Sequence, residues 1–264
     1  MFPGDFVMRR KAFTLIELLV VIAIIAMLLS IVMPAIRSAK GIAQRVVCTS
    51  NLKQLQLGWL MYADANDERI PGANVGNAAF GWVESMMASD PWEVQIEAIE
   101  QGALFDYIGT TDCYRCPTSK KGEARSYSIV SSMNTNNKNT WKKKEGVYFK
   151  KSDIVAPGSR HVFICEGVIT NHAWGVNYNT PQWKGQDPPP VRHNGGAFSF
   201  VDGHSDFNKW QDKRTFEWAE VVEQAAIASG NPDYMHKAAS PEQPDNEDLV
   251  YCQKGMWGNL GYAR

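Results

Sequence analysis

One uninterrupted apolar segment dominates the hydrophobic pattern of the chain. It runs from Phe13 to Ile36, and Glu17 is its only ionisable residue. The segment has 24 residues, and a helix needs about 20 apolar residues to cross the hydrocarbon core of a bilayer. The pattern therefore predicts a membrane-spanning helix near the N-terminus rather than a buried helix of a soluble domain.

Apolar residues continue after this segment at steps of three and four, which is the spacing of an amphipathic helix. They recur from Ile36 to Met61, and helix-breaking residues follow in the segment 64–72. We therefore expect a single helix from Phe13 to about Ala65, on the order of 80 Å long. Its second half should place an apolar stripe on a soluble domain.

The remainder of the chain predicts a hairpin and a further helix. Residues 197–208 alternate between apolar and polar on either side of Asp202-Gly203, which is a strong hairpin signal. A two-residue turn would place Phe198 opposite Phe207 on a buried face and leave the other face in solvent.

An amphipathic helix is predicted for residues 211–229, where Gly230 stops it, and residues 231–264 are expected to be irregular. The fold class is therefore α+β, with a long N-terminal helix packed on a small antiparallel sheet.

Composition excludes several classes of function. The 27 basic and 28 acidic residues give a net charge of −1, which offers no sign of a nucleic-acid partner. Hydrophobic residues make up 44% of the chain and indicate a folded domain. Five cysteines are too few for a disulfide scaffold, and their odd number leaves at least one thiol unpaired within the chain.

The apolar segment does not fit a secretory signal peptide well. It is too long, and no small-x-small cleavage pattern follows it. Arg9, Arg10 and Lys11 precede it, and two basic residues follow at Arg37 and Lys40. This asymmetry slightly favours a cytoplasmic N-terminus.

The start of the segment resembles the N-terminus of type IV prepilins and pseudopilins, in the residues Lys11-Ala12-Phe13-Thr14-Leu15-Ile16-Glu17. The resemblance implies that a prepilin peptidase cuts after Ala12, where the family prefers Gly, and that the new amino group of Phe13 is methylated. A carboxylate in the membrane costs roughly 2.5–3.5 kcal/mol, and Glu17 would offset this by pairing with the amine of a neighbouring subunit. Pro34 falls where the family also carries a proline.

The same resemblance implies a pilin-like subunit, made as an inner-membrane precursor with a cytoplasmic N-terminus and a periplasmic or extracellular domain. Its expected partners are the prepilin peptidase and N-methyltransferase, other pilin or pseudopilin subunits, an inner-membrane assembly platform and the lipid bilayer. The expected product is a type II secretion pseudopilus or a type IV pilus-like filament. The chain would divide into a leader 1–12, an assembly half 13–36, an amphipathic half 37–66, a soluble domain 67–230 and a tail 231–264.

The segment around Cys48 and Asn51 is similar to a large pseudopilin-like branch common in Planctomycetes, Verrucomicrobia and Lentisphaerae. His193, Asp202 and Gly203 resemble the His-x9-Asp-Gly signature of that branch, which is associated with processing or export. In this chain eight residues, not nine, separate the histidine from the aspartate.

Two sets of residues are candidates for metal or redox chemistry. Asp202, His204 and Asp206 could ligate a divalent cation such as Ca²⁺, but the hairpin geometry favours a turn role for Asp202, and we expect no metal or other cofactor.

Cys113-x2-Cys116 is a single pair, whereas a zinc ribbon needs two. In an exported domain oxidation is the default. The resemblance favours a Cys48–Cys116 disulfide, with Cys113–Cys116 as the alternative, and the sequence does not decide between them.

Two other functions compete with filament assembly. The same anchor could display a glycan-binding module, because the chain has nine tryptophans; core packing is the ordinary role of such residues. Six of them are Trp82, Trp92, Trp141, Trp174, Trp183 and Trp210. A tethered enzyme could use His193, Asp202 or Cys165, but no set of nucleophile, base and orienting group appears by spacing. We therefore expect no catalytic activity.

Overall fold

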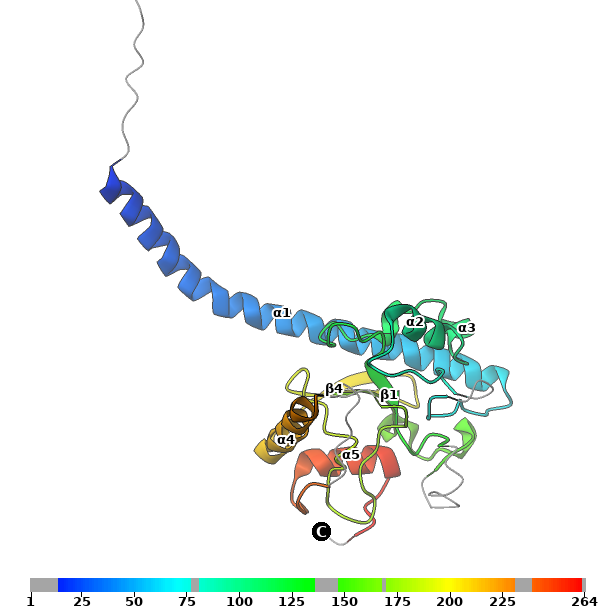
Figure 1. Ribbon diagram of the computed structural model, residues 1–264. Coiled ribbons are helices and arrows are strands. Elements are labelled where there is room, and N and C mark those ends of the chain that lie inside the picture. The colour runs from blue at the N-terminus through cyan, green and yellow to red at the C-terminus, as the bar shows by residue number, and fades with distance from the viewer. Residues whose placement is uncertain (1–13, 77–80, 136–146, 168–169, 231–238, 263–264) are drawn as a thin grey trace, which may run out of the picture. The chain divides into compact units, whose positions relative to one another are not determined.

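The structure is a computed structural model that describes residues 14–76, 81–135, 147–167, 170–230 and 239–262. The chain divides into two units, residues 1–43 and 44–264. Helix α1 (Leu15–Ala65) begins in the first unit and ends in the second. With a four-stranded antiparallel sheet it forms the α+β, pilin-like fold that the sequence predicts (Figure 1).

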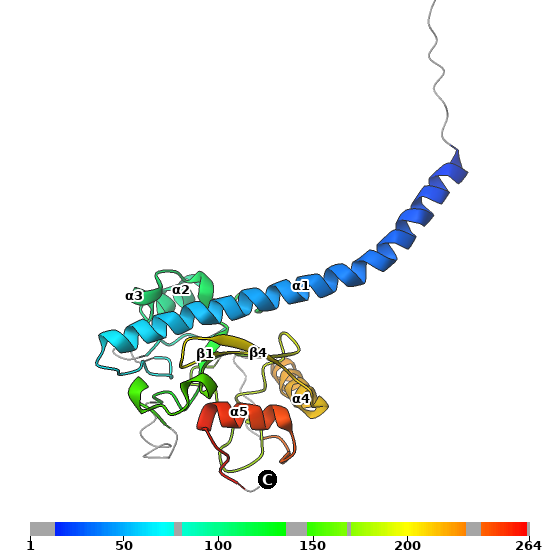
Figure 2. The same ribbon diagram turned by 180° about the vertical axis from the view of Figure 1, so that it is seen from behind.

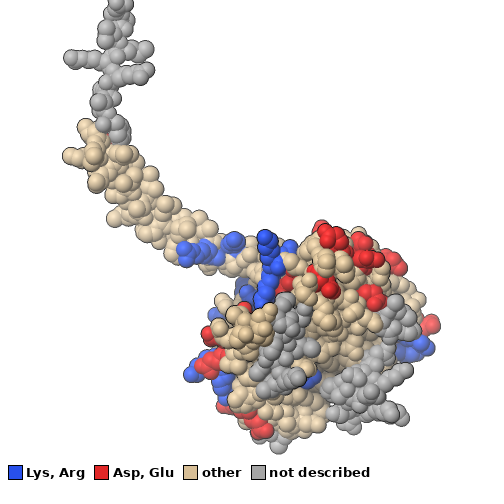
Figure 3. Space-filling model, in the orientation of Figure 1, with Lys and Arg blue, Asp and Glu red and all other residues tan. Residues whose placement is uncertain are grey.

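The first unit presents the apolar part of α1. Its large apolar side chains from Leu15 to Ile36 are 44–79% exposed. The helix is long and apolar enough to cross a membrane, with a mean hydropathy of 3.1 in its most apolar window. Figure 3 shows this part of the helix as a largely uncharged surface up to a group of basic residues further along. Pro34 lies inside the helix and leaves the carbonyl of Ser30 without its helical donor.

The second unit is built around the sheet, whose strands lie in the order β1-β2-β3-β4. Their bounds are Tyr127–Ile129, His161–Cys165, Gly195–Phe200 and Ser205–Lys209. Around it lie α2 (Trp92–Glu100), α3 (Phe105–Ile108), α4 (Lys213–Ser229) and α5 (Glu247–Trp257), with short 3₁₀ turns at Asp112–Tyr114, Lys151–Asp153 and Pro157–Ser159.

Helices α1 and α5 cover opposite faces of the sheet (Figures 1 and 2). Strand β3 is buried along its whole length between them. On one face the Ser199 hydroxyl donates to Gln56 Oε1 of α1 at 2.8 Å. On the other face the ring of Phe198 packs against Tyr251 of α5, with 5.4 Å between ring centroids.

The second half of α1 supplies a large part of the core. Leu52, Leu55 and Trp59 are fully buried, as the predicted apolar stripe requires. Burying a side chain of this size stabilises a fold by about 1.5–3 kcal/mol relative to leaving it exposed. The helix ends at Ala65, where the sequence also predicts its end.

The predicted hairpin forms, but its predicted register is wrong by one residue. Ala197 lies opposite Phe207, and Phe198 lies opposite Asp206. The connection has three residues instead of two, because Gly203 adopts a positive φ of 99° and the Phe200 amide bonds to the His204 carbonyl. The expectation that the face carrying Ser199 is solvated is also wrong, because α1 covers that face and buries Ser199.

The prediction of an irregular tail is wrong for Glu247–Trp257, which form helix α5. Asn246 caps its start, since its side chain accepts from the Leu249 amide, and Gly258 ends it in a left-handed conformation. A Cβ at Gly255 would lie 2.0 Å from His161 Cε1, so the helix needs glycine there to approach the sheet.

Helix α4 agrees with its prediction. It spans Lys213–Ser229, starts at an Asp212 cap that accepts from the Arg214 amide, and ends at Gly230 with φ of 62°. Buried Asp248 of α5 accepts from the Asp212 amide at 2.9 Å and so ties the two helices together.

His161 is a buried imidazole at the start of β2, under α5. Its ring stacks on Phe198 at 4.2 Å and packs against Phe200 and Tyr251. Burial lowers its pKa to about 3, and the nearby charges of Arg160 and His204 act in the same direction.

This burial predicts a specific acid sensitivity. The pKa of this imidazole in the unfolded chain is about 6.5. At pH values between the folded and unfolded pKa, the unfolded chain binds one more proton than the folded chain. The contribution of His161 to the free energy of unfolding is therefore complete above pH 6.5 and decreases as the pH falls. We expect a loss of about 2 kcal/mol between pH 7 and pH 5. His161→Gln should be less stable at pH 7 but should lack this loss. Urea unfolding in detergent, followed by tryptophan fluorescence, measures both; an equal loss in the variant would contradict the assignment.

Candidate functional site

The N-terminal processing site lies at the edge of the described residues. Ala12 and Phe13 are outside them. Thr14 and Glu17 are described and form a capping box at the start of α1. The Glu17 carboxylate accepts from the Thr14 amide and hydroxyl, both at 2.9 Å, and the Thr14 hydroxyl accepts from the Glu17 amide at 3.3 Å. In the single chain Glu17 therefore has a local partner.

The two parts of the His-x8-Asp-Gly motif do not form one site. His193 precedes β3, and Asp202 follows it, so a strand about 20 Å long separates them. Asp202 Oδ1 accepts from the His204 amide at 3.1 Å and lies 2.5 Å from His204 Nδ1. This confirms the predicted turn role of Asp202. Asp206, the third predicted candidate for a cation, accepts from the Phe207 amide.

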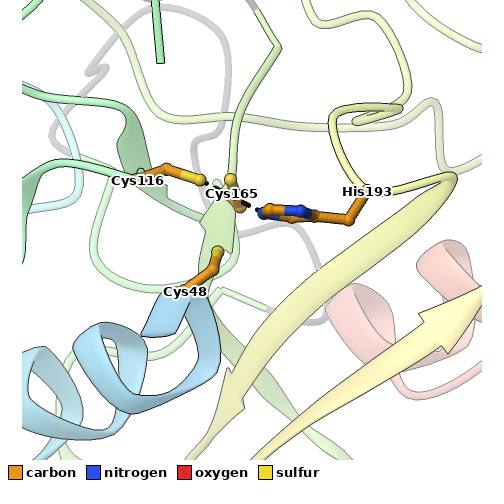
Figure 4. A group of neighbouring side chains, drawn as sticks. All are labelled: Cys48, Cys116, Cys165 and His193. Carbon is orange, nitrogen blue, oxygen red and sulfur yellow. Dashed lines mark hydrogen bonds between the residues drawn. The ribbon is translucent and has the colours of Figure 1, made fainter. Parts of the chain in front are cut away.

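His193 lies instead in a cluster with three cysteines. The cluster consists of Cys48, Cys116, Cys165 and His193, whose ligand atoms all lie within 4.8 Å of one another. Figure 4 shows the four side chains pointing toward a common centre from four separate segments. The cysteines are at most 1% exposed, and His193 is partly buried. We call these four residues the thiol–imidazole cluster.

Helix α1 and strand β2 supply two of its members. Cys48 lies on the buried stripe of α1, one turn before Leu52. Cys165 ends β2 and lies opposite Tyr127 of β1. The Tyr127 hydroxyl donates to Cys48 Sγ at 3.4 Å, so the first helix and the sheet meet at these sulfurs.

Two loops supply the other members. The Cys116 amide donates to Ser126 Oγ at 2.6 Å, which holds the loop beside β1. His193 belongs to a turn in which the Asn194 amide bonds to the Val191 carbonyl and Asn194 has a φ of 59°. The two side chains meet with 3.2 Å between Cys116 Sγ and His193 Nε2.

The cluster favours a single thiolate on Cys116. Hydrogen bonds from the thiols of Cys165 and Cys48, and a further one from His193, lower the pKa of Cys116. The hydrogen bond to Cys116 raises the pKa of Cys48 to about 12 and that of Cys165 well above its usual value, and burial adds to both. Such a group can bind one soft metal ion or undergo thiol–disulfide exchange.

Arg192 links the loops that carry the cluster. Its guanidinium donates to the carbonyls of Glu166 at 2.8 Å and Thr118 at 3.0 Å, and to Glu123 Oε2 at 3.0 Å. Burial acts to lower its pKa, but Glu123 and the thiols of Cys165 and Cys116 outweigh burial and raise it. One largely buried cation, whose side chain is 9% exposed, therefore lies beside the cluster and holds three of its segments in place.

All five cysteines are free in the structure, and the two disulfide pairings stay predictions. Cys48 and Cys116 do come together, as the Cys48–Cys116 prediction requires. Their sulfurs share their surroundings with Cys165 and His193 instead of forming one bond. Cys113 is buried but lies outside the cluster, and burial raises its pKa to about 11.

The sequence predicts at most one pair among these residues, Cys48–Cys116, and not the group of four. The four members are far apart along the chain, and only folding brings them together. The sequence offers Cys165 as a candidate nucleophile and His193 as part of the motif, but no spacing rule connects them. The buried stripe of α1, which includes Cys48, was the one local signal that a cysteine faces the core.

The tryptophans mainly fill the core. Trp82, Trp174 and Trp183 are fully buried, and Trp210 is 3% exposed. Trp92 is 43% exposed, and Trp141 lies outside the described residues. These positions do not form an aromatic platform within the described part of the chain.

Comparison with known proteins identifies only the N-terminus. Residues 7–33 match the family described as the prokaryotic N-terminal methylation motif. No curated protein and no solved structure matches the chain. The motif is of the prepilin type and supports a precursor of pilin or pseudopilin kind. Together with the apolar helix it is consistent with anchoring in a membrane.

The contacts of Arg192 predict that lysine cannot replace it. A single ammonium cannot bridge three carbonyl and carboxylate partners in different directions. We expect Arg192→Lys to lower the free energy of unfolding by about 2–4 kcal/mol. Arg214→Lys is the control, because Arg214 pairs with Asp212 and Asp245 at a more exposed position and should lose much less stability than Arg192→Lys. Urea unfolding measures both; equal losses would show that Arg192 is not a link between the loops.

Proposed function

We propose that the protein is a pilin-like subunit that polymerises through α1 into a type II secretion pseudopilus or a type IV pilus-like filament. Before assembly it is an inner-membrane precursor with a cytoplasmic N-terminus. Prepilin peptidase cuts it after Ala12, and Phe13 is then methylated. The role is structural, and the proposal assigns the chain no catalytic step.

One observation carries the proposal: the methylation motif overlaps an apolar surface that the described chain leaves exposed. The motif covers residues 7–33, and the apolar side chains from Leu15 to Ile36 are 44–79% exposed. A surface of this kind must be covered by lipid or by other protein. In a precursor that moves from the bilayer into a filament, lipid covers this surface first and neighbouring subunits cover it afterwards.

The assembly contact that we propose lies at Glu17. In a filament its carboxylate pairs with the methylated amine of Phe13 in a neighbouring subunit, because a buried charge needs a partner. The capping box with Thr14 satisfies the same carboxylate in the unassembled chain. Pro34 loosens α1 by removing one helical hydrogen bond where the helix leaves the bilayer.

The partners of this proposal are the prepilin peptidase and N-methyltransferase, other pilin or pseudopilin subunits, and an inner-membrane assembly platform. The second unit would lie in the periplasm or outside the cell. We assign it to the pseudopilin-like branch with the His-x9-Asp-Gly signature, on the residues His193, Asp202 and Gly203. The alternative of a glycan-binding module has no support in the burial of the tryptophans described above.

The proposal predicts where the N-terminus of the mature protein lies. Protein isolated from the native envelope should begin at Phe13 and carry one methyl group on its α-amino nitrogen. Intact-mass measurement and N-terminal peptide mapping read both features. A retained Met1, or a cut beyond Ile36, would exclude prepilin processing.

Two substitutions at Glu17 separate capping from assembly. Gln preserves the capping box, since its side-chain oxygen can accept from the Thr14 amide, but it removes the charge. Leu removes both. If the carboxylate pairs with a neighbouring amine, we expect Glu17→Gln and Glu17→Leu to insert and to be cleaved after Ala12, yet both to accumulate as unassembled subunits in the membrane.

Recovery of filaments from sheared cells, with immunoblots of the membrane fraction, measures this outcome. Thr14→Ala is the matched control, because it weakens the capping box and keeps the carboxylate; it should assemble. If Glu17→Gln assembles like wild type while Glu17→Leu does not, Glu17 acts as a helix cap and not as an assembly contact.

A further inference from the structure

The thiol–imidazole cluster has the ligand set of a structural zinc site. Three cysteines and one histidine are a common combination for tetrahedral Zn²⁺. The set comprises Cys48, Cys116, Cys165 and His193, and all four ligand atoms lie within 4.8 Å of one another. We propose that these four residues bind one zinc ion, which fastens α1 to the sheet and to two loops of the second unit.

The distances suit a single ion. With Zn–S of about 2.3 Å and Zn–N of about 2.0 Å, tetrahedral ligand atoms lie about 3.5–3.8 Å apart. Cys116 Sγ and His193 Nε2 are 3.2 Å apart, so a shift of a few tenths of an ångström accommodates the metal. The upper limit of 4.8 Å for the other pairs allows them the same spacing.

Burial indicates a structural rather than a catalytic metal. A catalytic zinc keeps one position open for water or substrate, whereas a structural zinc has four protein ligands. Here four protein ligands are present, and the three cysteines are at most 1% exposed. Binding displaces the remaining thiol protons to solvent and transfers no electron.

The surroundings match the charge of such a site. Zn²⁺ with three thiolates and a neutral imidazole carries a net charge of −1, which a low-dielectric interior must compensate. Arg192 supplies a largely buried positive charge next to His193, and its bonds reach the end of β2 beside Cys165 and the loop that carries Cys116. The Tyr127 hydroxyl donates to Cys48 Sγ, and Thr118 Oγ1 lies 3.1 Å from Cys116 Sγ. Outer-shell contacts of this kind orient metal ligands.

A disulfide explains the cluster less well. A disulfide joins two sulfurs at about 2.05 Å and would leave the third thiol and His193 without a role. Zinc uses all four groups. It also gives His193 a function that a turn position alone does not require.

Metal analysis of the full-length protein, purified in detergent without added chelator, tests the proposal. We expect about one zinc per chain by elemental mass spectrometry. Cys116→Ser should bind zinc at least tenfold more weakly. Cys113→Ser is the matched control, because Cys113 is equally buried, lies three residues away and is not in the cluster; it should retain the full zinc content.

Two measurements on the wild type remain decisive if Cys116→Ser does not fold. A chelator should lower the melting temperature, and added zinc should restore it. Alkylation in denaturant with chelator, and without reductant, should then modify all five cysteines. Absence of zinc combined with alkylation of two fewer cysteines would overturn the proposal in favour of a disulfide. Stoichiometric copper or iron in place of zinc would also overturn it.

Discussion

Helix α1 carries a large apolar surface in both units, and most of it has to be removed from water by different means in each. In the second unit Leu52, Leu55 and Trp59 are fully buried in the core. In the first unit the apolar side chains up to Ile36 are exposed, so their cover has to come from outside the described chain. One continuous helix thus carries an intramolecular interface and an external one.

The sheet of the second unit is small, and buried polar contacts compensate for its size. Its strands have three, five, six and five residues, while long loops connect them. Side chains that reach from one segment to another hold these loops: Ser199 bonds to α1, Asp248 joins two helices, and Arg192 joins three segments. The Ser199 contact is buried and the contacts of Asp248 and Arg192 are part-buried, and hydrogen bonds in such surroundings are stronger than at the surface.

The sequence predicts the parts of this structure that local patterns determine. Helix α1 follows from its apolar periodicity, helix α4 from Gly230, and the turn role of Asp202 from its place before Gly203. The register of the hairpin was predicted incorrectly, because the positive φ of Gly203 allows a turn of three residues instead of two. Helix α5 was not predicted, because its hydrophobic pattern is short and follows residues typical of loops. The thiol–imidazole cluster was not predicted for a different reason. It depends on strand pairing and on a loop contact, and neither can be read from the local spacing of residues.

The placement of the cluster also sets the order in which it can be completed. More than half of the chain lies between Cys48 and His193. During synthesis Cys48 leaves the ribosome long before the histidine exists, and Cys116 and Cys165 follow at intervals. The four groups meet only after β2 and β3 pair, since Cys165 ends the first of these strands and His193 precedes the second. Closing so long a loop is a late event in folding. The cysteines that are synthesised first therefore remain free of their final neighbours for some time. The moment at which the nascent chain first meets an oxidant then helps to determine the oxidation state of these cysteines in the mature protein.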